Sequence, residues 1–142
     1  MRNARDRAGP RLAAIVAVTA VTVTIAGCSP RVLESPSGLL VPVAAEYNGM
    51  EALLEGELAT TSGGCLAVRW GEPATVTVIV TAPGTRLEGD SAVVMPGHES
   101  LTVGDTVALG GGFRNPDDWP ENIALPAECD SETEVFFVNS GG

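Results

Sequence analysis

Residues 74–81, with the sequence ATVTVIVT, carry the strongest strand signal in the chain. Threonine and β-branched aliphatic residues favour a pleated, half-buried strand, and here they alternate with a period of two. One face of the predicted strand holds Val76, Val78 and Val80, and the other holds Thr75, Thr77, Ile79 and Thr81. Turn residues bound the strand on both sides, at Gly71-Glu72-Pro73 and at Pro83-Gly84. The stretch therefore predicts a short strand that is bounded by a turn at each end.

Segments before and after residues 74–81 show the same pattern of short strands separated by Gly and Pro. In residues 51–60, Leu54 and Leu58 share a face opposite Glu55 and Glu57, as expected for a strand with one buried face. Further strands are predicted at residues 65–70, 92–95, 101–109 with a turn at Gly104-Asp105, and 134–139. No helix of normal length is predicted, because Gly49 interrupts the candidate helix at residues 44–55.

These five or six short strands without helical crossovers predict an all-β fold with antiparallel pairing. A small antiparallel barrel is the favoured architecture, because closure of the sheet removes exposed strand edges. The alternative is an immunoglobulin-like sandwich, which usually has about seven strands and a Cys…Trp…Cys order. Trp70, which the alternation places on the inner face of its strand, follows Cys65 by five residues, closer than the sandwich pattern expects. Gly110-Gly111-Gly112 is interpreted as a bulge or a tight corner of the barrel.

The N-terminal region has the composition of an export signal, with four Arg in residues 1–11 and no charged residue in residues 12–27. This apolar run of 16 residues is shorter than the length of about 20 that a membrane-spanning helix needs. It ends in Ile25-Ala26-Gly27-Cys28, which resembles the lipobox of bacterial lipoproteins. The resemblance implies that diacylglycerol is attached to Cys28 and that the chain is cleaved before this residue. The alternatives are an uncleaved signal anchor and an ordinary signal peptide.

The sequence predicts three parts: a lipoprotein signal peptide at 1–27, the lipidated Cys28 with a flexible tether at 28–49, and a secreted β-barrel domain at 50–142. The tether is inferred from Pro, Ser and Gly in residues 29–48, where no strand or helix period persists. Alternatively, this segment packs on the domain as an edge strand through four apolar residues, Leu39, Leu40, Val41 and Val43. The mature protein is expected on the outer face of the cytoplasmic membrane, with the membrane as its partner through the lipid on Cys28.

The chain contains three Cys, an odd number that requires an explanation in an exported protein. If Cys28 carries lipid, Cys65 and Cys129 remain, and an oxidising exterior favours a disulfide between them. The bridge would close a loop of about 65 residues, which contributes roughly 4 kcal/mol in the chain-entropy model. The alternative is a pair of buried free thiols. A metal site is not expected, because neither Cys has a second Cys or a His nearby in sequence.

A second resemblance extends over residues 50–140. It is carried by Gly64-Cys65-Leu66, Ala82-Pro83-Gly84, Val103-Gly104-Asp105, Gly110-Gly111-Gly112, Pro126-Ala127-Glu128-Cys129 and Val135-Phe136. These motifs are similar to those of small uncharacterised lipoproteins of high-GC Gram-positive bacteria. The resemblance implies a secreted OB-like barrel, and it implies no activity.

Charge is distributed unevenly between the export signal and the rest of the chain. The chain has 8 Arg, no Lys and 18 acidic residues, of which residues 28–142 retain 4 Arg and 17 acids, a formal charge of −13. Such an acidic surface repels phosphate backbones, so nucleic acid is not expected as a partner. The acidity is interpreted as a solubility feature, with a site for a cationic ligand or Ca²⁺ as the alternative.

Residues 117–121 are the best candidate for a ligand site, because three carboxylates adjoin an aromatic residue. The candidate residues are Asp117, Asp118, Trp119 and Glu121. They could hold a sugar, an amine or Ca²⁺, although Ca²⁺ needs six to eight oxygen ligands and the EF-hand spacing is absent. The alternative is a Pro-rich loop with solvated acids. His98, the sole His, lies between turn residues and is interpreted as solvated.

No catalytic constellation is visible, since there is no Gly-x-Ser-x-Gly elbow and the Cys residues are assigned to lipid and disulfide. No catalytic residue, cofactor or metal is therefore expected. We interpret the mature domain as a non-enzymatic binding or accessory module of the cell envelope, with a protein or an envelope glycan as its partner. The alternatives are a hydrolase that uses the carboxylates of residues 117–121 and a purely structural envelope component.

Overall fold

The structure, a computed structural model, describes residues 29–45, 49–115, 125–129 and 134–140. Within these ranges the chain forms strands and one short 3-10 helix, η2, at Ala127–Cys129. The strands are β1 (Arg31–Glu34), β2 (Leu40–Val43), β3 (Ala52–Thr60), β4 (Leu66–Trp70), β5 (Thr75–Val80), β6 (Arg86–Glu88), β7 (Ala92–Val94), β8 (Ser100–Thr102), β9 (Thr106–Arg114) and β10 (Val135–Val138). The all-β fold class predicted from the sequence is confirmed.

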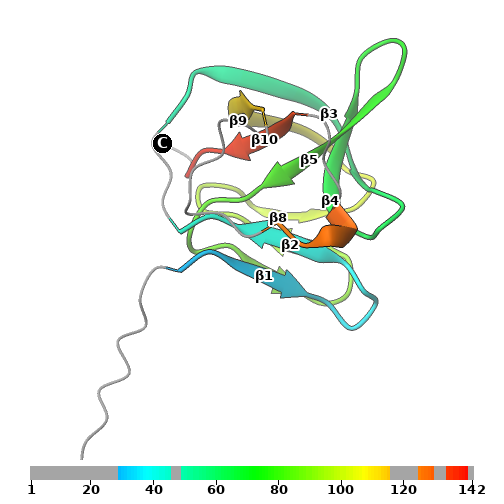
Figure 1. Ribbon diagram of the computed structural model, residues 1–142, viewed down its shortest axis with the longest axis vertical. Coiled ribbons are helices and arrows are strands. Elements are labelled where there is room, and N and C mark those ends of the chain that lie inside the picture. The colour runs from blue at the N-terminus through cyan, green and yellow to red at the C-terminus, as the bar shows by residue number, and fades with distance from the viewer. Residues whose placement is uncertain (1–28, 46–48, 116–124, 130–133, 141–142) are drawn as a thin grey trace, which may run out of the picture.

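Five strands form a closed barrel in the order β10-β5-β4-β3-β9 (Figure 1). The first three barrel strands form a meander, and the last one in the chain inserts between the third and the fourth. This is the strand order of the OB-fold, a small Greek-key barrel. The predicted OB-like barrel is therefore confirmed. The immunoglobulin-like sandwich is wrong, because the sheet closes on itself.

The barrel is mixed instead of purely antiparallel. β5 and β10 run parallel, with Phe136 opposite Ile79, while the other neighbouring barrel strands are antiparallel. Residues 81–134 separate these two strands in sequence, so no tight hairpin dictates antiparallel pairing between them. The prediction of antiparallel pairing throughout is wrong for this one pair, which closes the barrel.

A second layer of strands covers one end of the barrel. The β1–β2 hairpin and the β6-β7-β8 sheet lie below the barrel in Figure 1. Five buried apolar residues of this layer belong to the main core cluster, and they are Leu39, Val41, Val43, Val93 and Met95. β2 is also hydrogen-bonded to the barrel, because Thr81 N–H donates to Pro42 O at 2.8 Å and Ala44 N–H donates to Thr81 O at 3.0 Å. The layer is therefore an integral part of the domain.

The flexible tether predicted at residues 28–49 is wrong for residues 31–45, which are folded. β1 and β2 pair with each other in antiparallel register. Alternate side chains of this segment are at most 5% exposed, and they are Leu39, Val41 and Val43. Pro36 lies in the turn of the hairpin, and Pro42 contributes a carbonyl oxygen that accepts from Thr81 Oγ1 at 2.9 Å. The alternative interpretation as a packed strand is correct, because apolar alternation outweighs proline content here.

Both faces of β5 contact other residues, which explains why both alternating sets of residues 74–81 are β-branched. Ile79 belongs to the main core cluster and is fully buried. Val78 and Val80 belong to a second cluster outside it, together with Phe137 and the two disulfide cysteines. The predicted alternation is confirmed. The start of β5, near the tip of the β4–β5 hairpin, lies outside the core, and Val76 there is 42% exposed.

Gly110-Gly111-Gly112 does not form the predicted bulge, because all three residues lie inside β9 and pair with neighbouring strands in continuous register. A Cβ atom at Gly111 would collide with the carbonyl oxygen of Phe137, and one at Gly112 would collide with the side chain of Met50. Glycine is needed here because other groups occupy the space that a side chain would fill.

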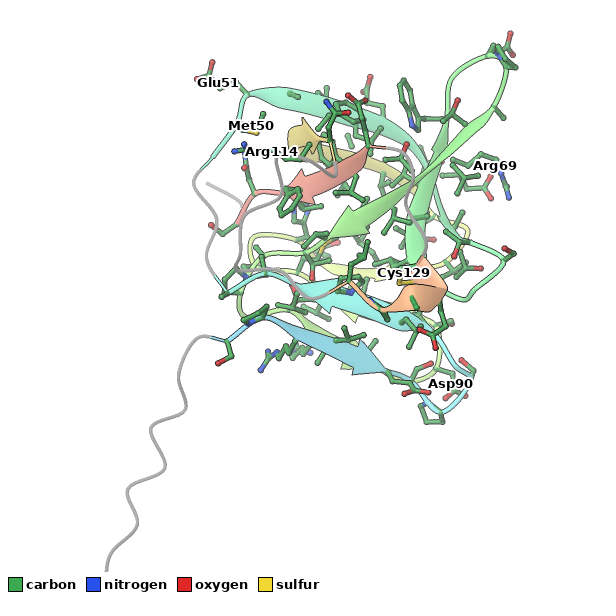
Figure 2. The ribbon with its side chains drawn as sticks, in the orientation of Figure 1. Met50, Glu51, Arg69, Asp90, Arg114 and Cys129 are labelled. Carbon is green, nitrogen blue, oxygen red and sulfur yellow. A yellow bond between two sulfur atoms is a disulfide. The ribbon has the colours of Figure 1, made fainter. Side chains whose placement is uncertain are left out.

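Cys65 and Cys129 form a disulfide, as the sequence predicts. Their Cα atoms lie 5.3 Å apart, and both residues are buried. The bond joins the start of β4 to η2, where Figure 2 labels Cys129. The two segments also touch through their backbones, since a Cβ atom at Gly63 would collide with the carbonyl oxygen of Glu128. The disulfide therefore fixes the chain before β10 onto the barrel.

Candidate functional site

A groove of about 370 Å³ opens between the β4–β5 hairpin and the adjoining ends of β9 and β10. This volume lies within the range of about 300 to 1,000 Å³ that is typical of ligand pockets. The residues that line the groove are Trp70, Thr75, Val76, Thr77, Phe113, Asn115 and Glu134. They come from three segments that are distant in sequence, the β4–β5 hairpin, the end of β9 and the residue before β10, so the barrel itself assembles the site.

The groove exists because the β4–β5 hairpin extends beyond the barrel wall. β4 pairs with β3 only as far as Arg69, and β5 pairs with β10 at Ile79 and Val80. Trp70 and Thr75, which pair with each other near the hairpin tip, therefore have a strand neighbour on one side. Figure 1 shows the hairpin projecting from the part of the molecule opposite the β1–β2 hairpin. The inner side of this projection is one wall of the groove.

Aromatic side chains form a preorganised surface in the groove. The ring centroids of Trp70 and Phe113 lie 5.7 Å apart with planes tilted by 42°, and Phe113 meets Phe136 edge-on at 5.0 Å. Trp70 Nε1–H donates a hydrogen bond to Thr77 Oγ1 at 2.8 Å, which fixes the orientation of the indole. Since Phe136 is fully buried, the aromatic series runs from the barrel core to the surface. A ligand would therefore meet a surface that is already ordered.

The remaining lining groups are mainly polar. They include the hydroxyl of Thr75, the amide of Asn115 and the carboxylate of Glu134. An aromatic surface flanked by such groups suits a ligand with an apolar face and hydrogen-bonding edges, such as a sugar ring. Among the residues that the structure describes, no group of three or more His, Cys, Asp or Glu side chains could hold a metal ion.

A second hollow of about 250 Å³ lies between the turn of the β1–β2 hairpin and the turn after β6. Its lining residues are Ser37, Gly38, Leu39, Thr60, Gly64, Asp90, Ser91 and Val103. Ser37 Oγ donates a hydrogen bond to the Asp90 carbonyl oxygen at 2.8 Å, which links the two turns. This hollow has no aromatic lining, so the groove beside Trp70 is the better ligand site.

The ligand loop predicted from the sequence lies outside the described residues, as does Cys28. The loop residues are Asp117, Asp118, Trp119 and Glu121. Asp117 follows Asn115 by two residues in sequence, and Asn115 lines the groove. His98 lies in the turn between β7 and β8, where its backbone N–H donates to Met95 O at 3.0 Å. The residue lies in a loop, as the sequence predicts, and it is partly buried.

The groove was not predicted from the sequence. Trp70 packs against the main core cluster, as the alternation predicts, and it is half-buried because it also lines the groove wall. One signal could have indicated this, because Trp70 and Thr75 flank the turn residues 71–74 and therefore lie at a hairpin tip. Residues at a tip extend past the barrel wall when the strands are longer than their partners on the other side.

The fold and the groove together define a small disulfide-linked barrel with the strand order of the OB-fold and an aromatic groove on one side. Comparisons with protein-family models, curated proteins and solved structures found no match. A search of the described part of the chain for a helix long and apolar enough to span a membrane found none.

Proposed function

We propose that this chain is the precursor of a lipoprotein, anchored to the outer face of the cytoplasmic membrane through lipid on Cys28. Its barrel is a non-enzymatic binding module of the cell envelope, and its ligand is a neutral envelope glycan. The observation that carries the proposal is the lipobox Ile25-Ala26-Gly27-Cys28 at the end of the uncharged run 12–27. The preformed groove beside Trp70 supports the choice of ligand.

The chemistry of the N-terminal region supports lipidation. Small residues at Ala26 and Gly27 allow the extended backbone to enter a peptidase cleft, and the Cys28 thiol supplies the nucleophile for lipid transfer. Two acyl chains, at about 0.8 kcal/mol per buried CH₂ group, hold a protein stably in a bilayer where one chain does so only marginally. A diacylglycerol on Cys28 therefore suffices as the anchor.

Cysteine pairing also supports lipidation. The chain has three Cys, and the disulfide joins two of them, Cys65 and Cys129. Both are buried, so neither is accessible for lipid transfer in the folded domain. Lipid on Cys28 accounts for the third thiol, which an oxidising exterior would otherwise leave reactive.

The groove chemistry favours a neutral glycan. Trp70 and Phe113 offer aromatic faces for the apolar side of a sugar ring, and Thr75 and Asn115 offer hydrogen bonds to its hydroxyl groups. With 17 acids and 4 Arg, residues 28–142 repel polyanionic envelope polymers.

The Cys28→Ser variant tests the anchor. Serine lacks the thiol that accepts the lipid, so we expect complete loss of acylation and retention of residues 1–27. Metabolic labelling with an alkyne fatty acid, followed by intact mass measurement, detects both effects. The Cys65→Ser/Cys129→Ser variant is the matched control, and it keeps its label. Labelling of the Cys28→Ser variant at the level of the wild-type protein would contradict the proposal.

The Trp70→Ala variant tests the ligand site. Loss of a central aromatic contact costs about 1 to 3 kcal/mol, so we expect affinity for a neutral oligosaccharide from the envelope to fall about 5- to 150-fold. Calorimetric titration with soluble uncharged glycan fragments measures this change. Leu53→Ala is the control, because Leu53 is 60% exposed on β3 and does not line the groove. Equal loss in both variants, or no glycan binding by the wild-type protein, would refute the assignment.

A further inference from the structure

We propose that the folded domain sits directly on the membrane, with the end that carries the starts of β1 and β6 against phospholipid headgroups. This inference rests on the lipidation of Cys28 proposed above. It concerns a separate property, namely which surface of the domain faces the bilayer and which surface faces the envelope.

The connection between the lipid and the domain is very short. Ser29 and Pro30 are the two residues between Cys28 and the first residue of β1. The three steps from position 28 to position 31 span about 11 Å when fully extended. A compact domain of about 100 residues has a radius of gyration of about 13 Å. Since the connection is shorter than this radius, the start of β1 must lie at the headgroups.

β1 is held in place by its contacts, so it cannot serve as additional tether. It pairs with β2 along its length. The Arg31 side chain donates from Nη2 to the carbonyl oxygen of Thr85 at 3.3 Å, and Leu33 packs against the main core cluster. Detaching β1 to lengthen the connection would break these contacts and expose part of the core.

Arg31 and Arg86 lie at the same end of β1 and β6, which run side by side. At one end, the Arg31 guanidinium contacts the backbone of Thr85, the residue before Arg86. At the other end, Ser37, which follows β1, donates to the Asp90 carbonyl oxygen. Figure 2 shows Asp90 at the end of this layer away from the point where the chain enters β1. The lipid-bearing end thus holds two of the four Arg that remain after position 28.

Glu88 forms an ion pair with Arg86 at 3.4 Å, and the far end of the same two strands holds the acids Glu34 and Asp90. Guanidinium groups bind phosphate oxygens through paired hydrogen bonds, and anionic headgroups attract cationic side chains within a Debye length. Arg31 and Arg86 therefore suit contact with headgroup phosphates, while the acids are repelled from them. The short connection between Cys28 and β1 and the positions of Arg31 and Arg86 together favour one orientation of the domain on the membrane.

This orientation places the ligand groove away from the membrane. The β4–β5 hairpin, which forms one wall of the groove, projects from the part of the molecule opposite β1 (Figure 1). A glycan in the envelope can reach Trp70 without crossing the headgroup layer.

Photo-crosslinking to lipid tests the orientation in the full lipidated protein. The vesicles contain about three parts phosphatidylglycerol to seven parts phosphatidylcholine. A photo-reactive amino acid replaces one of three exposed residues: Glu99, beside the Arg86 end, Asp90 or Val76. Position 99 is near the end that carries the starts of β1 and β6, because Arg86 pairs with Val94 and Gly84 lies beside Pro96. We expect at least fivefold more lipid adduct from position 99 than from the other two, and equal yields would overturn the proposal.

A matched pair of charge reversals tests the role of Arg86. Arg86 and Arg69 are both exposed, and each lies 3.4 Å from a Glu carboxylate, that of Glu88 and that of Glu57. Figure 2 labels Arg69 on β4, away from the β1–β2 hairpin. We expect Arg86→Glu to lower the adduct yield at position 99 several-fold and Arg69→Glu to leave it unchanged. Equal effects of the two variants would contradict the proposed contact.

Two further measurements separate the possible failures. The mass of the same sample reports acylation of Cys28, so an unacylated chain refutes the proposed function, whereas an acylated chain with uniform adduct yields refutes only the orientation. A 20-residue Gly/Ser insertion after Pro30 gives the domain a long tether. We expect this insertion to remove the preference for position 99, and an unchanged preference would show that the short connection does not set the orientation.

Discussion

The Cys65→Ala/Cys129→Ala variant is expected to lose about 4 kcal/mol of unfolding free energy, because the disulfide closes a long loop in the unfolded chain. The two cysteines are 64 residues apart in sequence, and both are buried in the second core cluster. For a domain of about 100 residues, this loss lowers Tm by roughly 15 °C. Guanidinium unfolding followed by tryptophan fluorescence measures the free energy, and thermal unfolding by circular dichroism measures Tm.

The wild-type protein with its disulfide chemically reduced is the control for this variant. Its stability should fall to nearly that of the double-alanine variant, since both have lost the same cross-link. Loss of less than about 1 kcal/mol in the variant would show that the bond contributes little, contrary to the chain-entropy argument. The disulfide then could not be what holds η2 and the chain before β10 on the barrel.

Phe136→Ala is expected to cost about 3 to 5 kcal/mol, the usual range for truncation of a buried aromatic residue. Phe136 is fully buried in the main core cluster, and its ring meets that of Phe113 edge-on at 5.0 Å. It also lies on β10, the strand that closes the barrel between β5 and β9. Truncation leaves a cavity next to that closure, so urea unfolding should show a large drop in midpoint with an unchanged slope.

Phe136→Leu provides the matched comparison because it retains much of the apolar volume. It should cost less than half of what Phe136→Ala costs. Equal losses in the two variants would mean that the aromatic ring contact, and not the buried volume, dominates at this position. A loss below about 1 kcal/mol for Phe136→Ala would contradict the placement of this side chain in the barrel core.

Strands with strict alternation were predictable from the sequence, because burial on one face leaves a period of two in the residue types. Residues 51–60 and 74–81 show this most clearly, and they correspond to β3 and β5. The disulfide was also predictable, since assigning Cys28 to lipid leaves one pair. These features depend on local pattern or on simple counting, which a single sequence contains.

Features that depend on contacts between distant segments were not predictable in the same way. The β1–β2 hairpin was interpreted as a tether because Pro36 and Pro42 interrupt a short apolar pattern, and its burial arises from contact with β5. The parallel pairing of β10 with β5 likewise has no local signal, because it is set by closure of the barrel.

The groove illustrates the same limit for the candidate site. Trp70 and Thr77 come from one hairpin, but Phe113 and Glu134 come from strands that only barrel closure brings beside it. The sequence instead indicated residues 117–121, where acids and an aromatic residue are adjacent in the chain. Adjacency in sequence was visible, whereas adjacency in space required the strand order.

Intact mass spectrometry of the protein extracted from the membrane, combined with peptide mapping without reduction, tests the central claim most directly. We expect a chain that begins at Cys28 with diacylglycerol on its sulfur, together with a peptide pair cross-linked through Cys65 and Cys129. A mature protein that retains residues 1–27, or one in which Cys28 is disulfide-bonded to either of the other cysteines, would contradict it.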